Sequence, residues 1–402
     1  MKKIFIPIIL IFMPFLFLNA QWTQTSLKDK IVFALATNGK NIFAGTVDEG
    51  VYISSDTGMT WTQSLKTRRS IYSLAVIGNY VFAGSDSGVF RSSNNGENWT
   101  RTNLADFCIN SLVAKGKLLF AGTYYHGIFV STDYGLTWEP TERLDERVTS
   151  LAADSNNLYA GALYSGVFHS TNNGINWTRT SLNYESVFSL SINKENIFAG
   201  TENGIYQSSN NGGDWNNIGL NNRNVLSLLT DNYSVLAGTK SDGIYFAQYK
   251  DNWLPRNQNL GNMTVLSILR SNYFILIGTG GSGVFRRESY ELTALLPLGS
   301  PIPDNFRLYQ NYPNPFGSVS RVEFDIAKLG EQNENLVTLK FYDILGKEVA
   351  TYINELLKPG HYYYYYDGSK LESGVYFVQL IVVDGIKKTV IFYDTKKIFL
   401  IK

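Results

Sequence analysis

Two glutamates have the residue type and the spacing that catalysis could use. Glu146 and Glu185 lie 39 positions apart, each five residues before the leucine of a short apolar segment. Paired carboxylates roughly 5–9.5 Å apart are what glycoside hydrolysis requires. Arg147 and Arg223 occur close to the same pattern, and solvated rim charges bridged by arginines are the simpler interpretation. We therefore expect no catalytic residues and keep Glu146 and Glu185 for an alternative, enzymatic interpretation.

Tyrosines near the two glutamates form a second candidate. Tyr124, Tyr125, Tyr164 and Tyr184 fall in adjacent repeats and could build an aromatic platform for a sugar ring or a peptide. The plainer alternative is that they are ordinary tyrosines at hairpin tips. The candidate ligand face comprises Arg69, Tyr124, Tyr125, His126, Tyr164, Tyr184 and Arg223.

The other reactive side chains predict no metal or cofactor chemistry. Cys108 is the single cysteine, which excludes an internal disulfide and a cysteine-based zinc cluster. The three histidines, His126, His169 and His361, are scattered along the chain. The 35 basic and 34 acidic residues leave a net charge of +1, which argues against a nucleic-acid partner.

A repeat of 38 or 39 residues must position these side chains. A step such as Phe82-Ala83-Gly84 recurs with that period, and a period near 40 residues indicates a solenoid or a propeller. With 17% charged residues, 14% aromatic residues and 35 glycines, the composition favours an all-β chain. All seven tryptophans keep the same register: Trp22, Trp61, Trp99, Trp138, Trp177, Trp215 and Trp253.

One repeat reads as four short antiparallel strands, which describes a propeller blade. Trp22 precedes the first of the glycine steps, and no tryptophan follows the last step at Gly278. The N-terminal strand should therefore be the missing fourth strand of the last blade. Pairing it there would hide the open edges at both ends of the sheet array. We predict a seven-bladed propeller over residues 21–288. In the second repeat the four strands are Ile71–Leu74, Tyr80–Gly84, Gly88–Ser92 and Asn98–Arg101.

The turns between third and fourth strands share a motif. In the third repeat the turn runs from Ser131 to Trp138, with Asp133, Gly135 and Trp138 at the motif positions. The motif resembles the Asp-box, also called the bacterial neuraminidase repeat. Asp or Asn can hydrogen-bond its own backbone, Gly can take a positive φ, and the Trp ring would pack between blades. The five clear copies are Asp56, Gly58, Trp61; Asn94, Gly96, Trp99; Asp133, Gly135, Trp138; Asn172, Gly174, Trp177; and Asn210, Gly212, Trp215.

This resemblance implies a fold and little chemistry. Asp-boxes occur in sialidases, xyloglucan-cleaving glycosidases, sortilin-type receptors and photosystem assembly factors, where the box is structural and lies away from the active face. A sialidase would need an arginine triad, a tyrosine–glutamate pair and typically six blades. That residue set cannot be assigned here, and the predicted blade count is seven.

The N-terminus has the layout of a secretory signal peptide. Lys2 and Lys3 precede the uncharged run Ile4–Leu18, and Asn19-Ala20 offers a cleavage site before Gln21. We assign residues 1–20 to this signal and expect no transmembrane span in the mature form, since the run is short and broken by proline.

The C-terminal segment has a different composition. A proline-bearing linker over 289–304 precedes a small Ig-like β-sandwich over 305–402. The stretch Gln310–Phe316, the segments Leu339–Val349 and Ser373–Phe377, and the basic end Lys397–Lys402 closely resemble the type A sorting domain of the type IX (Por) secretion system. The resemblance implies a Bacteroidetes-like bacterium, export through the periplasm and the type IX machinery as partner.

These observations predict a secreted or outer-membrane surface-attached, non-catalytic binding propeller whose ligand is a glycan or a cell-surface protein. One alternative is a glycan-active enzyme of the glycoside hydrolase or sialidase type. Another alternative, an envelope assembly factor, rests on fold analogy.

Overall fold

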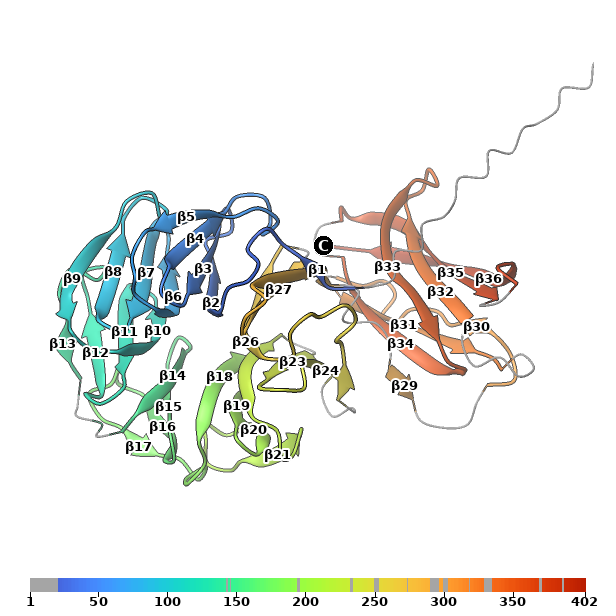
Figure 1. Cartoon of the computed structure of the whole chain (residues 1–402). Coiled ribbons are helices and arrows are strands. Elements are labelled where there is room, and N and C mark those ends of the chain that lie inside the picture. Colours follow the sequence, from blue (N-terminus) through green and yellow to red (C-terminus); the bar gives the residue numbers. More distant parts are fainter. Residues whose placement is uncertain are drawn as a thin grey trace, which may run out of the picture.

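The computed structural model describes residues 21–402 except 142–143, 145, 194–195, 232–233, 249–252, 273, 290–295, 299–302, 318, 329–334, 369–370 and 385–386. The predicted signal peptide lies outside the described residues. The chain forms seven four-stranded antiparallel sheets arranged as a propeller, drawn from blue to yellow in Figure 1, and a second β domain drawn in orange and red. The all-β, seven-bladed prediction is confirmed.

Each blade places its four strands in chain order. The first three blades contain β2 (Val32–Thr37), β3 (Ile42–Thr46), β4 (Gly50–Ser54), β5 (Thr62–Leu65); β6 (Ile71–Ile77), β7 (Tyr80–Ser85), β8 (Gly88–Ser92), β9 (Thr100–Ala105); and β10 (Ile109–Lys115), β11 (Leu118–Thr123), β12 (Ile128–Ser131), β13 (Glu139–Pro140). The next three contain β14 (Val148–Ala153), β15 (Leu158–Ala162), β16 (Gly166–Ser170), β17 (Thr178–Arg179); β18 (Val187–Asn193), β19 (Asn196–Thr201), β20 (Gly204–Ser208), β21 (Asn216–Gly219); and β22 (Val225–Thr230), β23 (Ser234–Thr239), β24 (Ile244–Gln248), β25 (Leu254–Pro255).

The seventh blade joins the two ends of the propeller. It contains β26 (Val265–Ser271), β27 (Phe274–Thr279), β28 (Val284–Glu288) and the N-terminal strand β1 (Thr23–Gln24), which pairs with β28. Trp22 is fully buried, and its backbone N–H donates to the Gln258 carbonyl at 3.0 Å. The predicted closure by the N-terminal strand is therefore confirmed, and it completes the fourth strand of the last blade so that the ring joins both ends of the propeller.

The recurring step that ends in glycine, Phe82-Ala83-Gly84 in the second blade, is explained by how neighbouring blades meet. A Cβ atom on Gly84 would lie 2.7 Å from the side chain of Ile109, in the first strand of the next blade. Gly45 would meet Ile71 in the same way, also at 2.7 Å. Only glycine lets consecutive inner strands approach this closely, so the glycine step records blade packing.

The C-terminal domain is a sandwich of two four-stranded sheets. Side chains from both sheets, including Phe324 and Phe341, share one buried core. Strand β29 falls inside the segment expected to be a linker and pairs with β34, which the sequence did not indicate. The sheets contain β29 (Leu296–Leu298), β34 (Gly360–Asp367), β31 (Val319–Ile326), β30 (Arg307–Leu308), and β33 (Glu348–Leu357), β32 (Asn335–Tyr342), β35 (Gly374–Asp384), β36 (Val390–Leu400).

Across the part of the chain that the structure describes, no helix is long and apolar enough to cross a membrane.

Candidate functional site

The strands alternate in direction, so the connections divide between two faces of the propeller. The box face carries the hairpins between first and second strands together with the Asp-box turns; the Asn95 N–H, for example, donates to the Asn79 carbonyl of a hairpin at 2.9 Å. The loop face carries the turns between second and third strands and the loops that lead to the next blade. The predicted ligand residues lie on the loop face.

Each Asp-box turn is held by its own side chains. In the first copy, Asp56 Oδ1 accepts hydrogen bonds from the N–H groups of Met59 at 3.0 Å and Thr60 at 2.9 Å, and the Ser54 hydroxyl donates to it at 2.8 Å. Burial alone would raise the pKa of Asp56, but these bonds and that from the Thr60 hydroxyl outweigh burial and hold the pKa at about 2. The Asp133 copy behaves alike, with a pKa of about 2.

The box tryptophans pack between blades, as predicted. Trp138 is 6% exposed and joins a cluster that includes Phe82 and Val89 of the preceding blade and Leu119 of its own. The indole N–H of Trp99 reaches back to the Ser64 hydroxyl of the preceding blade at 2.9 Å. The box therefore stabilises the contact between neighbouring blades as well as its own turn.

The residue before each box glycine also has a left-handed backbone, which the motif did not predict. Asn95 and Tyr134 have φ of 57° and 56°. Each of these residues touches the preceding blade: Asn38 Nδ2 donates to Asn95 Oδ1 at 3.0 Å, and the ring of Tyr134 stacks on Tyr80 at 4.8 Å. Asn173 likewise accepts from Lys115 Nζ at 2.8 Å.

On the loop face, backbone hydrogen bonds bring the predicted residues of the fourth blade together. The N–H of Leu163 donates to the Arg147 carbonyl at 3.0 Å, and that of Gly166 donates to the Glu185 carbonyl at 2.9 Å. The turn that carries Tyr164 is thus fixed between the loop of Arg147 and the loop of Tyr184 and Glu185.

Arg147 links this turn to the tyrosines of the third blade. Its guanidinium carbon lies 5.2 Å from the ring centre of Tyr124 and 5.1 Å from that of Tyr125, within range of cation–π attraction. The two rings meet edge to face at 4.4 Å. His126 packs edge-on against Phe107 at 4.9 Å. Sequence reasoning listed Arg147 only as a neighbour of Glu146 and missed this role.

Three tyrosines stand out from the loop face. Tyr125, Tyr164 and Tyr184 are 63%, 65% and 79% exposed. Tyr164 and Tyr184 have φ of 65° and 73°, an uncommon backbone for a bulky residue. Such outliers concentrate at functional sites, where the surrounding structure maintains them.

The two glutamates each have partners of their own. Glu146 pairs with Arg179 at 3.1 Å and accepts from the Ser165 hydroxyl at 2.5 Å. Glu185 accepts from Asn203 Nδ2 at 3.1 Å. Both carboxylates are thus bound to polar neighbours within the fourth and fifth blades. Asp145 lies outside the described residues.

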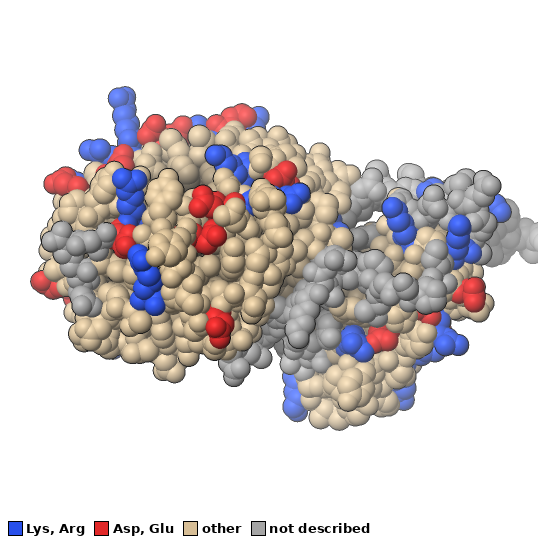
Figure 2. Space-filling view, turned by 90° about the horizontal axis from the view of Figure 1, so that it is seen from below, with Lys and Arg blue, Asp and Glu red and all other residues tan. Residues whose placement is uncertain are grey.

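The two remaining candidate arginines also form ion pairs. Arg69 lies 3.8 Å from Asp86, and Arg223 lies 3.5 Å from Asp242, each pair bridging two connections of the loop face. Figure 2, which views the molecule from below Figure 1, shows basic and acidic side chains interspersed over the propeller surface. This mixed pattern gives no single-sign field of the kind that steers a highly charged ligand.

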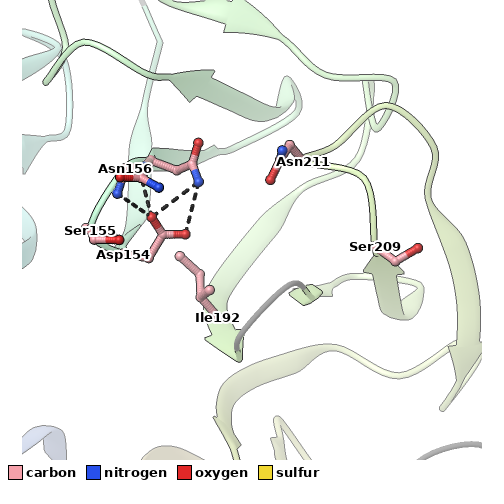
Figure 3. Close-up of a pocket in the computed structure, with 8 residues that line it drawn as sticks. Asp154, Ser155, Asn156, Ile192, Ser209 and Asn211 are labelled. Atoms are coloured by element: carbon pink, nitrogen blue, oxygen red, sulfur yellow. Dashed lines mark hydrogen bonds between the residues drawn. The ribbon is translucent and has the colours of Figure 1, made fainter.

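A polar pocket lies elsewhere, between the fourth and fifth blades on the box face (Figure 3). Its volume is about 620 Å³, and its lining comprises Ala153, Asp154, Ser155, Asn156, Asn157, Ile192, Ser209 and Asn211. Sequence reasoning missed this pocket. The one available signal was Asp154, which takes the hairpin position that Asn38 holds in the first blade.

The sorting signature draws together the start and the end of the C-terminal domain. Asn311 is buried, and its Nδ2 donates to the Pro313 carbonyl at 2.9 Å and to the hydroxyls of Ser320 at 2.8 Å and Tyr366 at 3.1 Å. Phe316 exchanges backbone hydrogen bonds with the last strand, from its own N–H to the Phe399 carbonyl at 2.9 Å and back from Ile401 at 2.9 Å.

Residues 310–392 match the secretion system C-terminal sorting domain. The C-terminal domain is a secretion sorting domain. The protein is therefore directed to the cell surface or the extracellular space, as predicted. No curated protein matches the sequence.

Solved structures show the same fold at low sequence identity. YCF48 from Cyanidioschyzon merolae is 15% identical, with a TM-score of 0.56 over 67% of this chain and 98% of that one. The extracellular domain of BT4673 from B. thetaiotaomicron is 15% identical, with a TM-score of 0.57 over 92% of this chain and 53% of that one. The GH74 enzyme of Niastella koreensis is 17% identical, with a TM-score of 0.51 over 65% and 44% of the two chains. These likenesses establish the fold alone.

Proposed function

We propose that the exported propeller is a non-catalytic glycan-binding module whose ligand lies on the loop face of the third to fifth blades. The observation that carries the proposal is the set of exposed tyrosines Tyr125, Tyr164 and Tyr184. Tyr125 packs on Arg147, and backbone bonds of the Leu163–Gly166 turn fix Tyr164 between the loops of Arg147 and Glu185. Aromatic faces combined with a few fixed polar groups suit the apolar faces and hydroxyls of sugar rings.

The contacts of the two glutamates fit a non-catalytic module better than an enzyme. Glu146 is engaged by Arg179 and Ser165, and Glu185 by Asn203. Carboxylates held by an arginine or an amide are ordinary surface groups, whereas a glycosidase must keep one carboxyl protonated as its general acid. YCF48 has been solved with a D1 peptide, so a peptide is the other ligand class that the test should include.

The test is a glycan array read together with hydrolysis of the bound glycans. We expect the purified propeller to bind one class of glycan and to release no sugar from it, and Glu146→Gln to leave binding within about twofold. Turnover that Glu146→Gln abolishes would establish the enzymatic alternative. Binding of surface peptides, with no signal for any glycan, would overturn the carbohydrate assignment.

Export supplies a separate test of the C-terminal domain. Removal of residues 305–402 should leave a folded propeller inside the cell envelope, because the sorting domain has its own core. Immunoblots of the culture fluid and cell surface would check this. Full secretion of the truncated chain would contradict the assignment of that segment as the export signal.

A further inference from the structure

We propose that the pocket between the fourth and fifth blades binds a neutral mono- or disaccharide. This site is on the box face, distinct from the tyrosines of the loop face, and does not depend on the function proposed above. The pocket volume of about 620 Å³ is within the range of small-molecule sites.

The pocket exists because one inter-blade contact is missing. In the first blade, Asn38 Oδ1 accepts the N–H groups of Lys40 and Asn41, while Asn38 Nδ2 donates to Asn95 of the next Asp-box at 3.0 Å. Asp154 takes the same place in the fourth blade and makes the same turn, accepting from the N–H groups of Asn156 and Asn157 at 2.7 Å each. A carboxylate cannot donate to Asn211 as Asn38 donates to Asn95. The reverse bond does not replace it, because Asn211 bonds to Tyr159 and not to Asp154.

The facing residue has turned to a different partner. Asn211, the left-handed residue of the fifth Asp-box, accepts the hydroxyl of buried Tyr159 at 3.2 Å instead of bonding to the hairpin. Figure 3 shows Asn211 opposite the hairpin of Asp154 across the open space. Its amide nitrogen has no partner among the described residues and can donate to a ligand.

The wall formed by the hairpin is rigid. Asn157 Nδ2 donates to Asp154 Oδ2 at 3.1 Å, and the side-chain amide oxygen Asn157 Oδ1 is hydrogen-bonded to His169 Nε2 at 2.8 Å. The His169 ring stacks on Tyr159 at 4.5 Å, which connects the network to the core. Polar groups fixed by such supporting contacts bind a ligand at a lower cost in ordering.

The chemistry of the lining selects the ligand class. Asp154 Oδ2 accepts one bond within the hairpin, so it can accept a second from a sugar hydroxyl, and the amides of Asn156 and Asn211 can donate as well as accept. Ile192 adds an apolar surface on the adjacent strand. The pKa of Asp154 is lowered, because the hydrogen bonds from Asn157 and Asn156 outweigh the effect of burial. A carboxylate at the site disfavours phosphates and acidic sugars.

The repeat supplies both the blocking variant and its control. Tyr134 shows that a tyrosine fits the left-handed position of a box, where it stacks on Tyr80 of the preceding hairpin. Asn157 corresponds to Tyr80, so Asn211→Tyr should place a ring over Asn157 and fill the pocket. Asn173→Tyr makes the same change one box earlier, at a turn that bonds Lys115 and lines no part of the pocket.

The experiment is calorimetric titration of the full exported protein with neutral disaccharides (lactose, cellobiose, maltose and diacetylchitobiose), with sialyllactose and Ca²⁺ as comparison ligands. We expect one neutral disaccharide to bind, at least tenfold weaker binding in Asn211→Tyr, and unchanged binding in Asn173→Tyr. Asn156→Ala is a second variant that leaves the Asn211–Tyr159 bond untouched, because Asn156 is exposed. It should weaken binding severalfold. Tyr125→Ala should have no effect on this site.

Several results would overturn the proposal. These are binding of no neutral disaccharide, binding that survives both pocket variants, equal or tighter binding of sialyllactose, and a response to Ca²⁺ alone.

Discussion

The two faces of the propeller derive from the same repeat and differ in what holds them. On the box face, Asp56 and Asp133 each organise a turn through several hydrogen bonds, and buried tryptophans tie those turns to the preceding blade. On the loop face, the side chains of Tyr125, Tyr164 and Tyr184 extend into solvent. The comparison teaches that one face carries the stability of the ring, which leaves the other face available for recognition. The pocket beside Asn211 marks a place where the box face departs from this rule.

The largest effect that separates the faces should come from a box tryptophan. Trp138→Ala removes a ring that is 6% exposed between the second and third blades, and should cost about 3–5 kcal/mol in the free energy of unfolding. Denaturant unfolding of the propeller would measure it. A loss below about 1 kcal/mol would show that the box does not carry the stability of the ring.

Two glycines on the box face give a sharper contrast. Gly135 has φ of 77°, and a Cβ there would lie 2.6 Å from the Phe82 ring, so Gly135→Ala should destabilise by about 2–4 kcal/mol. Gly39, with φ of 86°, has nothing within 4 Å of such a Cβ, and Gly39→Ala should cost about 1 kcal/mol. Equal losses would mean that backbone conformation alone matters and that the box glycine is not needed for blade packing.

Part of the acid dependence of stability should arise from the Asp-box turns. Asp56 and Asp133 have pKa values of about 2 in the folded chain against 3.8 ordinarily, so their stabilisation is complete above about pH 4 and is lost as the pH falls toward 2. Because these side chains are solvent-facing, we expect less than about 1 kcal/mol from each. The double variant Asp56→Asn, Asp133→Asn should lose less stability over that pH window in thermal melts. An unchanged pH profile would contradict this.

The smallest effect on stability should come from the loop face. Tyr125→Ala removes a side chain that is 63% exposed and should change the free energy of unfolding by no more than about 0.5 kcal/mol. Thermal melts beside those of Trp138→Ala would check it. A cost above about 2 kcal/mol would assign the Tyr124–Tyr125–Arg147 cluster to structure and weaken its role in binding.

The sequence predicted the repeated parts of the molecule and missed the contacts made once. The spacing of the tryptophans and the glycine step repeat seven times, so the blade count, the packing of Trp138 and the closure at Trp22 followed from pattern alone. The stacking of Arg147 on two tyrosines, the pocket at Asp154 and the pairing of Phe316 with the last strand each depend on single residues brought together by the fold. Contacts of this kind leave no periodic pattern in the sequence. Asp154 differs from Asn38 by one functional group, and only the structure shows which bond that difference removes.

The most direct measurement is the affinity of two matched variants for the glycan selected on the array. Tyr164→Ala and Ile175→Ala each remove an exposed apolar side chain, 65% and 68% exposed, one on the loop face and one at a box turn. Glycan binding by the loop face predicts at least a tenfold weaker affinity for Tyr164→Ala and an unchanged affinity for Ile175→Ala. Equal affinities in both variants, or a loss confined to Ile175→Ala, would contradict it.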